Sequence, residues 1–125
     1  RWLNAPNALS LEGLKGKVVL LDFWGQWCGP CVERLPRVEE LHARFKDRGL
    51  VVIGVHSARQ SDKLDEFLEA KKVSFPVMID SGESAERYPV DAWPTYFLID
   101  PAGKVVWGCS HEPPTAGRIE QLLGK

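Results

Sequence analysis

The chain has 125 residues, of which 44% are hydrophobic and 26% charged, and its formal net charge is -1 at pH 7. This length supports one domain with its own hydrophobic core, so we expect residues 1–125 to form a single domain. The nearly balanced charge argues against nucleic acid and anionic membrane surfaces as partners, and no apolar run is long enough for this segment to insert in a membrane.

The first part of the chain combines an irregular start with a buried strand and a long helix. Residues 1–17 show no regular pattern and are expected to form an irregular lead-in. Residues 18–24 (VVLLDFW) form a nearly continuous apolar run, which is typical of a strand buried on both faces. Residues 31–48 carry apolar side chains at helical spacing, with Pro36 inside the helix and Gly49 as its stop.

The middle of the chain repeats this alternation of strand and helix. Residues 51–56 (VVIGVH) predict a second buried strand, and residues 61–71 predict a second amphipathic helix. A short strand over 77–79 and a helical turn over 83–88 follow. The alternation indicates parallel pairing with right-handed crossovers.

The last part of the chain predicts an antiparallel hairpin and a final helix. Residues 95–100 (TYFLID) and 104–109 (KVVWGC) flank a connector whose residues favour a tight turn. Thr115 is a suitable cap for the last helix. We therefore expect an α/β fold with a mixed central sheet, half parallel β-α-β and half antiparallel hairpin, flanked by helices on both faces.

Two cysteines, Cys28 and Cys31, lie between the first predicted strand and helix. Disulfide exchange needs one thiolate that attacks and a second thiol that resolves the mixed disulfide. Cys28 is expected at the open helix N-terminus, which stabilises negative charge, so we interpret it as the nucleophile and Cys31 as the resolving thiol. Gly29 would let a partner backbone approach, and Pro30 would fix the first helical turn.

A zinc site is the alternative interpretation of this cysteine pair. It would need two more ligands, but Cys109, His42, His56 and His111 are scattered along the chain, so we expect no metal. Cys109 is most simply a small buried residue, and an exchanging third thiol is the alternative. His56 could tune the cysteine pair electrostatically, but a strand-end hydrogen-bonding role is the simpler interpretation.

Residues 20–31 (LLDFWGQWCGPC) resemble the active-site segment of the thioredoxin superfamily. The lead-in LSLEGLKGKVVLLDFW, an insertion over 57–74 and the hairpin that begins PTYFLID resemble the TlpA/ResA-type branch of extracytoplasmic thioredoxins. The segments VHS and WPT are also similar to thioredoxin-like domains fused to larger proteins. This resemblance implies the thioredoxin fold and a location outside the cytoplasm, with a cytoplasmic location as the alternative.

The resemblance also implies a substrate-binding segment. Pro94 matches the cis-proline that faces the active-site cysteines, which implies that an extended substrate pairs along Trp93, Pro94 and Thr95. A plain proline at the start of a strand is the alternative for Pro94. Trp27 is expected to be partly exposed beside Cys28, where its ring offers a flat apolar contact.

Asp22 matches the buried acid behind the resolving cysteine in the family. A carboxylate within an apolar strand is costly to bury, so desolvation should raise its pKa and suit it to accept the proton of Cys31. The alternative is a structural carboxylate paired with a lysine or with backbone donors.

We therefore expect a thiol–disulfide oxidoreductase of the protein-disulfide reductase type, acting as a monomer. It would act on a protein disulfide, receive electrons from an upstream thiol reductase and need no cofactor beyond its own redox-active disulfide. One alternative is a non-catalytic interaction or sensor module of a larger protein. The other is a thiol peroxidase, since peroxiredoxins share the fold.

Overall fold

The computed structural model describes residues 2–5, 9–10, 12–57, 63–80 and 92–124. The elements of this part of the chain are β1 (Trp2–Leu3), the 3-10 helix η1 (Glu12–Leu14), β2 (Val18–Trp24), α1 (Gly29–Phe45), the 3-10 helix η2 (Lys46–Arg48), β3 (Leu50–Ser57), α2 (Leu64–Ala70), β4 (Val77–Asp80), β5 (Thr95–Ile99), β6 (Val105–Ser110) and α4 (Ala116–Leu123). The predicted helical turn over 83–88 and the first two residues of the predicted helix over 61–71 lie outside the described residues.

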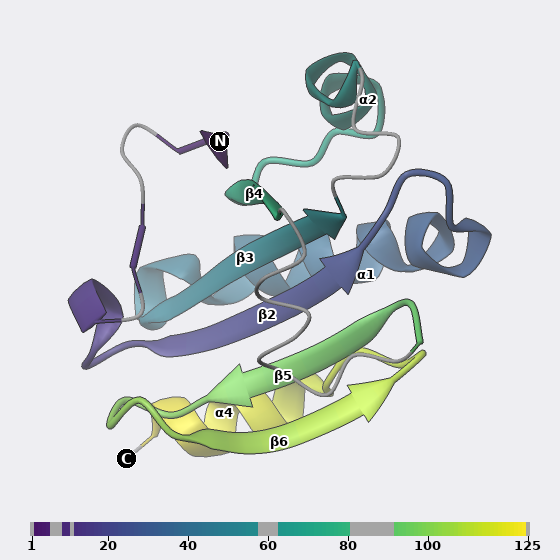
Figure 1. The fold of residues 1–125 in the computed structure, drawn as a ribbon. Coiled ribbons are helices and arrows are strands. Elements are labelled where there is room, and N and C mark those ends of the chain that lie inside the picture. The colour runs from purple at the N-terminus through teal and green to yellow at the C-terminus, as the bar shows by residue number, and fades with distance from the viewer. Residues whose placement is uncertain (1, 6–8, 11, 58–62, 81–91, 125) are drawn as a thin grey trace.

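The described strands form one sheet in the order β1-β4-β3-β2-β5-β6 (Figure 1). β2 pairs in parallel with β3, and β3 pairs in parallel with β4. β5 and β6 form an antiparallel hairpin that joins the sheet through antiparallel pairing of β5 with β2. The parallel half and the hairpin half are therefore both confirmed, and β2 lies at their junction.

The expectation of an irregular lead-in over 1–17 is wrong in part. Trp2 and Leu3 pair antiparallel with Met78 and Val77 at the outer edge of β4, and η1 adds a short helical turn. A strand of two residues is too short to show an alternating pattern, and the unpaired backbone of β4 supplies its hydrogen-bonding partner.

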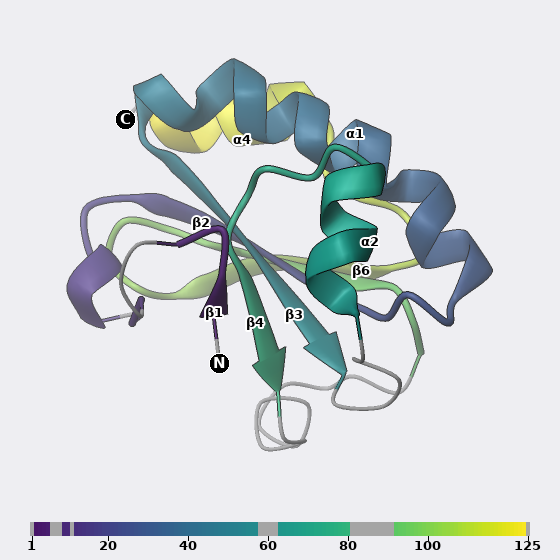
Figure 2. The same cartoon turned by 90° about the horizontal axis from the view of Figure 1, so that it is seen from above.

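Two core clusters lie on opposite faces of the sheet, and β2 contributes to both. Leu20 and Trp24 pack in the cluster that α1, α2 and α4 cover, whereas Leu21 and Phe23 pack in the other. α1 and α4 lie side by side over one face in both views (Figures 1 and 2). On the other face, apolar side chains of the N-terminal segment, such as Leu14, pack against the sheet.

The long helix α1 begins earlier than its apolar periodicity predicts. It starts at Gly29, ends at Phe45 and is followed by η2 and by Gly49, whose φ is 108°. Pro36 lies inside the helix, as expected. This start agrees with the position expected for Cys28 at the open helix N-terminus, and it places Cys31 in the first helical turn.

The last helix is capped as the sequence predicts. Thr115 has extended backbone angles, and its hydroxyl oxygen accepts the N–H of Arg118 at 3.2 Å. Ile119 anchors the helix in the core beneath it. Among the described residues, no helix is both long and apolar enough to cross a membrane.

Gly54 of β3 gives a test of how tightly this core is packed. A methyl group at this position would lie 2.9 Å from both a ring carbon of Phe75 and the indole nitrogen of Trp24. We expect Gly54→Ala to lower the free energy of unfolding by about 1–3 kcal/mol, measured by urea denaturation of the oxidised protein. Gly117→Ala is the control, because a methyl group there meets nothing within 4 Å and should be neutral or stabilising. Equal stability of the two variants would contradict this packing.

Candidate active site

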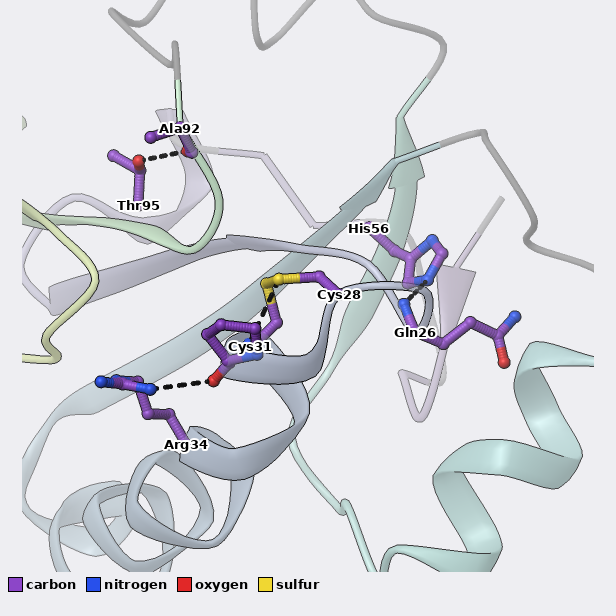
Figure 3. Close-up of a disulfide and its surroundings, with 8 residues drawn as sticks. Gln26, Cys28, Cys31, Arg34, His56, Ala92 and Thr95 are labelled. Carbon is purple, nitrogen blue, oxygen red and sulfur yellow. Dashed lines mark hydrogen bonds between the residues drawn. A yellow bond between two sulfur atoms is a disulfide. The ribbon is translucent and has the colours of Figure 1, made fainter.

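Cys28 and Cys31 form a disulfide at the start of α1, with their Cα atoms 5.3 Å apart (Figure 3). The chain leaves the sheet at the end of β2, makes a turn and enters the helix at Gly29. Pro30 lies in the first helical turn, where a proline costs no intrahelical hydrogen bond. Both Gly29 and Pro30 are exposed at this end of the helix.

Cys28 is the N-cap residue of α1. Its backbone is extended, with φ -101° and ψ 110°, and its Sγ accepts the N–H of Cys31 at 3.3 Å. The unpaired N–H groups and the dipole of a helix N-terminus stabilise a thiolate in this position. Cys28 is 7% exposed and Cys31 is 1% exposed, so Cys28 is the more accessible residue of the two.

The turn before the helix is closed by a hydrogen bond from the N–H of Cys28 to the carbonyl of Gly25 at 3.0 Å. The indole of Trp27 folds back over Gly25 so closely that a side chain there would overlap the ring. A side chain at Gly25 would therefore displace the indole of Trp27 from this position.

His56 reaches this turn from the end of β3. Its side chain is fully buried, and its Nε2 accepts the backbone N–H of Gln26 at 2.9 Å. Its Nδ1 lies within hydrogen-bonding distance of the Ser57 carbonyl, and the indole of Trp24 packs against the ring edge-to-face at 4.8 Å. Burial lowers the pKa of His56, although the hydrogen bond with Ser57 opposes this shift.

Sequence reasoning left His56 out of the site, although a signal for it was present. The parallel register places His56 beside Trp24, the last residue of β2, so the two parallel strands end at the same edge of the sheet. A polar side chain at that edge is directly adjacent to the turn that follows β2.

Asp22 lies in the middle of β2 on the face covered by α1. It is 1% exposed, and its Oδ1 has no hydrogen-bond partner among the described residues. Its burial raises the pKa of the carboxyl from 3.8 to about 8. The prediction of a buried acid with a raised pKa is confirmed, and in the described structure neither a lysine nor a backbone donor pairs with Oδ1, as the structural alternative would require.

Trp93, Pro94 and Thr95 enter β5 with a cis peptide bond between Trp93 and Pro94, as the family resemblance implies. The indoles of Trp27 and Trp93 pack edge-to-face, with 5.9 Å between their ring centroids. This contact joins the cysteine turn to the cis-proline segment. The Thr95 hydroxyl donates to the carbonyl of Ala92 at 2.6 Å, fixing the start of the strand (Figure 3).

Cys109 lies on β6, away from β2 in the sheet order. It is the cross-strand neighbour of Tyr96, which in turn pairs with Asp22. The thiol is free and half-buried, and its Sγ contacts the Ser110 carbonyl at 3.4 Å. The simpler interpretation expects a buried residue, but Cys109 is not fully buried, and its role in exchange stays a prediction to be tested.

A groove with a volume of about 550 Å³ runs beside the cysteine turn, between α1 and α2. Trp27 and Gly29 line it on one side and Phe67 on the other. No group of three or more His, Cys, Asp or Glu side chains in the described residues is arranged to hold a metal ion.

Comparison with known proteins shows which family this fold and this cysteine pair belong to. The sequence model of the AhpC/TSA family matches residues 4–108. The thiol-disulfide oxidoreductase ResA of Bacillus thuringiensis subsp. konkukian is 36% identical over 118 residues, which cover 94% of this chain and 68% of that protein. ResA of Bacillus subtilis is 37% identical over 99 residues, covering 78% of this chain and 55% of that protein.

Solved structures agree with these sequence relatives. A thioredoxin-like superfamily protein superposes with a TM-score of 0.90 at 25% identity, covering 100% of this chain and 92% of that chain. A putative thiol:disulfide interchange protein DsbE from Chlorobium tepidum superposes with a TM-score of 0.77 at 35% identity, covering 90% of this chain and 82% of that chain. The chain therefore belongs to the AhpC/TSA family, has the thioredoxin-like fold and is a thiol–disulfide oxidoreductase.

Proposed function

We propose that this enzyme is a protein-disulfide reductase in which Cys28 is the nucleophile and Cys31 the resolving thiol. The observation that carries the proposal is the position of Cys28 as the N-cap of α1, where its Sγ accepts a hydrogen bond from the N–H of Cys31. The lower exposure of Cys31 fits a sulfur that reacts with Cys28 rather than with the substrate.

The reaction consists of two exchanges. The Cys28 thiolate attacks one sulfur of the substrate disulfide, forming a mixed disulfide and releasing the other substrate sulfur as a thiolate, which takes up a proton. The Cys31 thiolate then attacks Cys28 Sγ and releases the second substrate sulfur. Two electrons have passed to the substrate, the Cys28–Cys31 disulfide has formed, and an upstream dithiol donor must reduce it again. No cofactor beyond this disulfide takes part.

Asp22 is the proposed proton acceptor for Cys31. Asp22 lies on the face of the sheet that α1 covers, and Cys31 packs on this same face. Burial raises the pKa of its carboxyl to about 8. A carboxylate with this pKa takes a thiol proton far more readily near neutral pH than an ordinary aspartate does.

The substrate is proposed to bind as an extended segment along Trp93, Pro94 and Thr95. The Trp27–Trp93 contact places this segment next to the cysteine turn, and Trp27 supplies an apolar surface there. The exposed backbone at Gly29 and Pro30 leaves room for the substrate to approach Cys28. The charge balance of the chain excludes no particular protein partner.

The enzyme is proposed to act outside the cytoplasm. It is also proposed to be a monomer whose one domain spans residues 1–125. The resemblance to the extracytoplasmic branch of the superfamily supports this location. A thiol peroxidase is disfavoured because Cys28 is paired with Cys31 rather than set alone in a peroxidatic loop.

Substitution of the cysteines tests the reductase directly. We expect Cys28→Ser to lower the rate of insulin disulfide reduction at least about 100-fold, because no thiolate remains to attack. Cys31→Ser should trap a mixed disulfide with the substrate, detectable by mass. Cys109→Ser is the matched control and should keep the wild-type rate. Full insulin reduction by Cys28→Ser would exclude the proposed nucleophile, and faster consumption of peroxide than of disulfide by the wild-type protein would favour the peroxidase.

Asp22→Asn should slow the resolving step selectively. We expect a loss of at least about ten-fold in the single-turnover rate of substrate thiol release at pH 7, because the proton acceptor for Cys31 is gone. The rate of the wild-type step should rise as the pH passes about 8, where Asp22 ionises. The exposed Asp47 provides the control Asp47→Asn, and equal rates for the two variants would rule out the proposed role of Asp22.

The raised pKa of Asp22 also predicts how stability depends on pH. The folded protein binds this proton more tightly than the unfolded chain does. The stabilisation that this proton provides is fully present below pH 3.8 and is lost as the pH rises through about 8. Asp22→Asn cannot ionise and should exceed the wild type in free energy of unfolding at pH 9 by more than about 1 kcal/mol. Urea denaturation at pH 5 and pH 9 measures this difference, and a wild type that is more stable than the variant at pH 9 would contradict the burial of a neutral carboxyl.

A further inference from the structure

We propose that His56 is a positioning residue for disulfide exchange: by holding the backbone N–H of Gln26, it fixes the turn that sets Cys28 at the N-terminus of α1. The inference rests on the proposed role of Cys28 as the nucleophile. It adds to that role a residue from β3 that acts through the backbone of the turn.

The hydrogen bonds of His56 define one protonation form of its ring. The N–H of Gln26 points at Nε2 from 2.9 Å, so Nε2 must carry a lone pair (Figure 3). Nδ1 faces the carbonyl oxygen of Ser57, which accepts but cannot donate, so the ring hydrogen must be on Nδ1. The neutral Nδ1–H tautomer satisfies both contacts at once.

The surroundings of His56 hold the ring in this orientation. Its side chain has no exposed surface, and the Trp24 indole packs against it with an angle of 87° between the rings. The neighbours of His56 across the sheet are Trp24 and Ile79, so no charged side chain lies beside it in either strand pairing. A buried ring with these neighbours presents its acceptor to the turn with little freedom to move.

The contact with Gln26 reaches the nucleophile through two further hydrogen bonds. Gln26 follows Gly25, whose carbonyl accepts the N–H of Cys28 at 3.0 Å and closes the turn. Cys28 Sγ then accepts the N–H of Cys31 in the first turn of the helix. Because the N–H of Gln26 lies inside this turn, losing its acceptor would loosen the backbone that sets the orientation of Cys28 toward the helix N-terminus.

Two substitutions at His56 separate its two hydrogen bonds. Gln carries its amide at the position of Nε2, so His56→Gln keeps an acceptor for Gln26. Asn carries its amide at the position of Nδ1, so His56→Asn keeps the donor to Ser57 and loses the acceptor for Gln26. The matched control pair is His42→Gln and His42→Asn, since His42 lies half-buried on α1 far along the helix from the cysteines.

The readouts are the reactivity of Cys28 and the exchange of one amide. With Cys31→Ser and Cys109→Ser as background, iodoacetamide reacts with Cys28, and its rate at pH 7 reports the thiolate fraction. We expect His56→Asn to slow this reaction at least about five-fold and His56→Gln to stay within about two-fold of the background protein. The backbone amide hydrogen of Gln26 should exchange slowly with solvent in the protein with an unchanged His56 and in His56→Gln. It should exchange rapidly in His56→Asn.

The outcomes decide between a positioning role and a general structural one. Equal alkylation rates for His56→Gln and His56→Asn, whether both normal or both slow, would overturn the proposal. So would rapid exchange of the Gln26 amide in the wild-type protein, a measurement that requires no variant to fold. Neither readout uses a protein substrate, so a failure of the reductase proposal would appear in the insulin assay and leave this test intact.

Discussion

The structure depends on one junction, where the buried strand β2 ends and the helix α1 begins with Cys28 as its N-cap. A helix N-terminus presents backbone N–H groups that lack intrahelical partners, and here the sulfur of Cys28 accepts one of them from Cys31. The electrostatic preference of a helix N-terminus for negative charge favours a thiolate over a neutral thiol at this position. The surrounding elements all serve to hold this helix end in place.

Each part of the proposed site comes from a different strand of the same sheet. β2 supplies Asp22 below the helix, β3 supplies His56 beside the turn, and β5 begins with the cis-proline segment at Pro94. The mixed pairing makes this possible, because β2 is parallel to β3 and antiparallel to β5. The end of β3 and the start of β5 therefore meet at the edge where β2 delivers the chain to Cys28.

The sequence predicted the elements whose signals are local and strong. The apolar run over 18–24, the cysteine spacing and the threonine cap of α4 each specify structure from within a few residues. It missed β1, whose two residues form a strand through pairing with β4 alone. It gave His56 a hydrogen-bonding role at the strand end but could not name the partner, because Gln26 lies 30 positions earlier in the chain.

The burial of Asp22 shows how the fold tolerates a group to which the proposed mechanism gives a role. A charged carboxylate without partners would be strongly destabilising in this core, and the carboxyl responds by keeping its proton, with a pKa of about 8. While the carboxyl keeps this proton, the protein avoids most of that cost. Only the ionised form of Asp22 can accept the proton of Cys31, and accepting it makes the carboxyl neutral again. The same desolvation that makes the acid costly makes it a stronger base, so stability and reactivity at this position oppose each other through one physical cause.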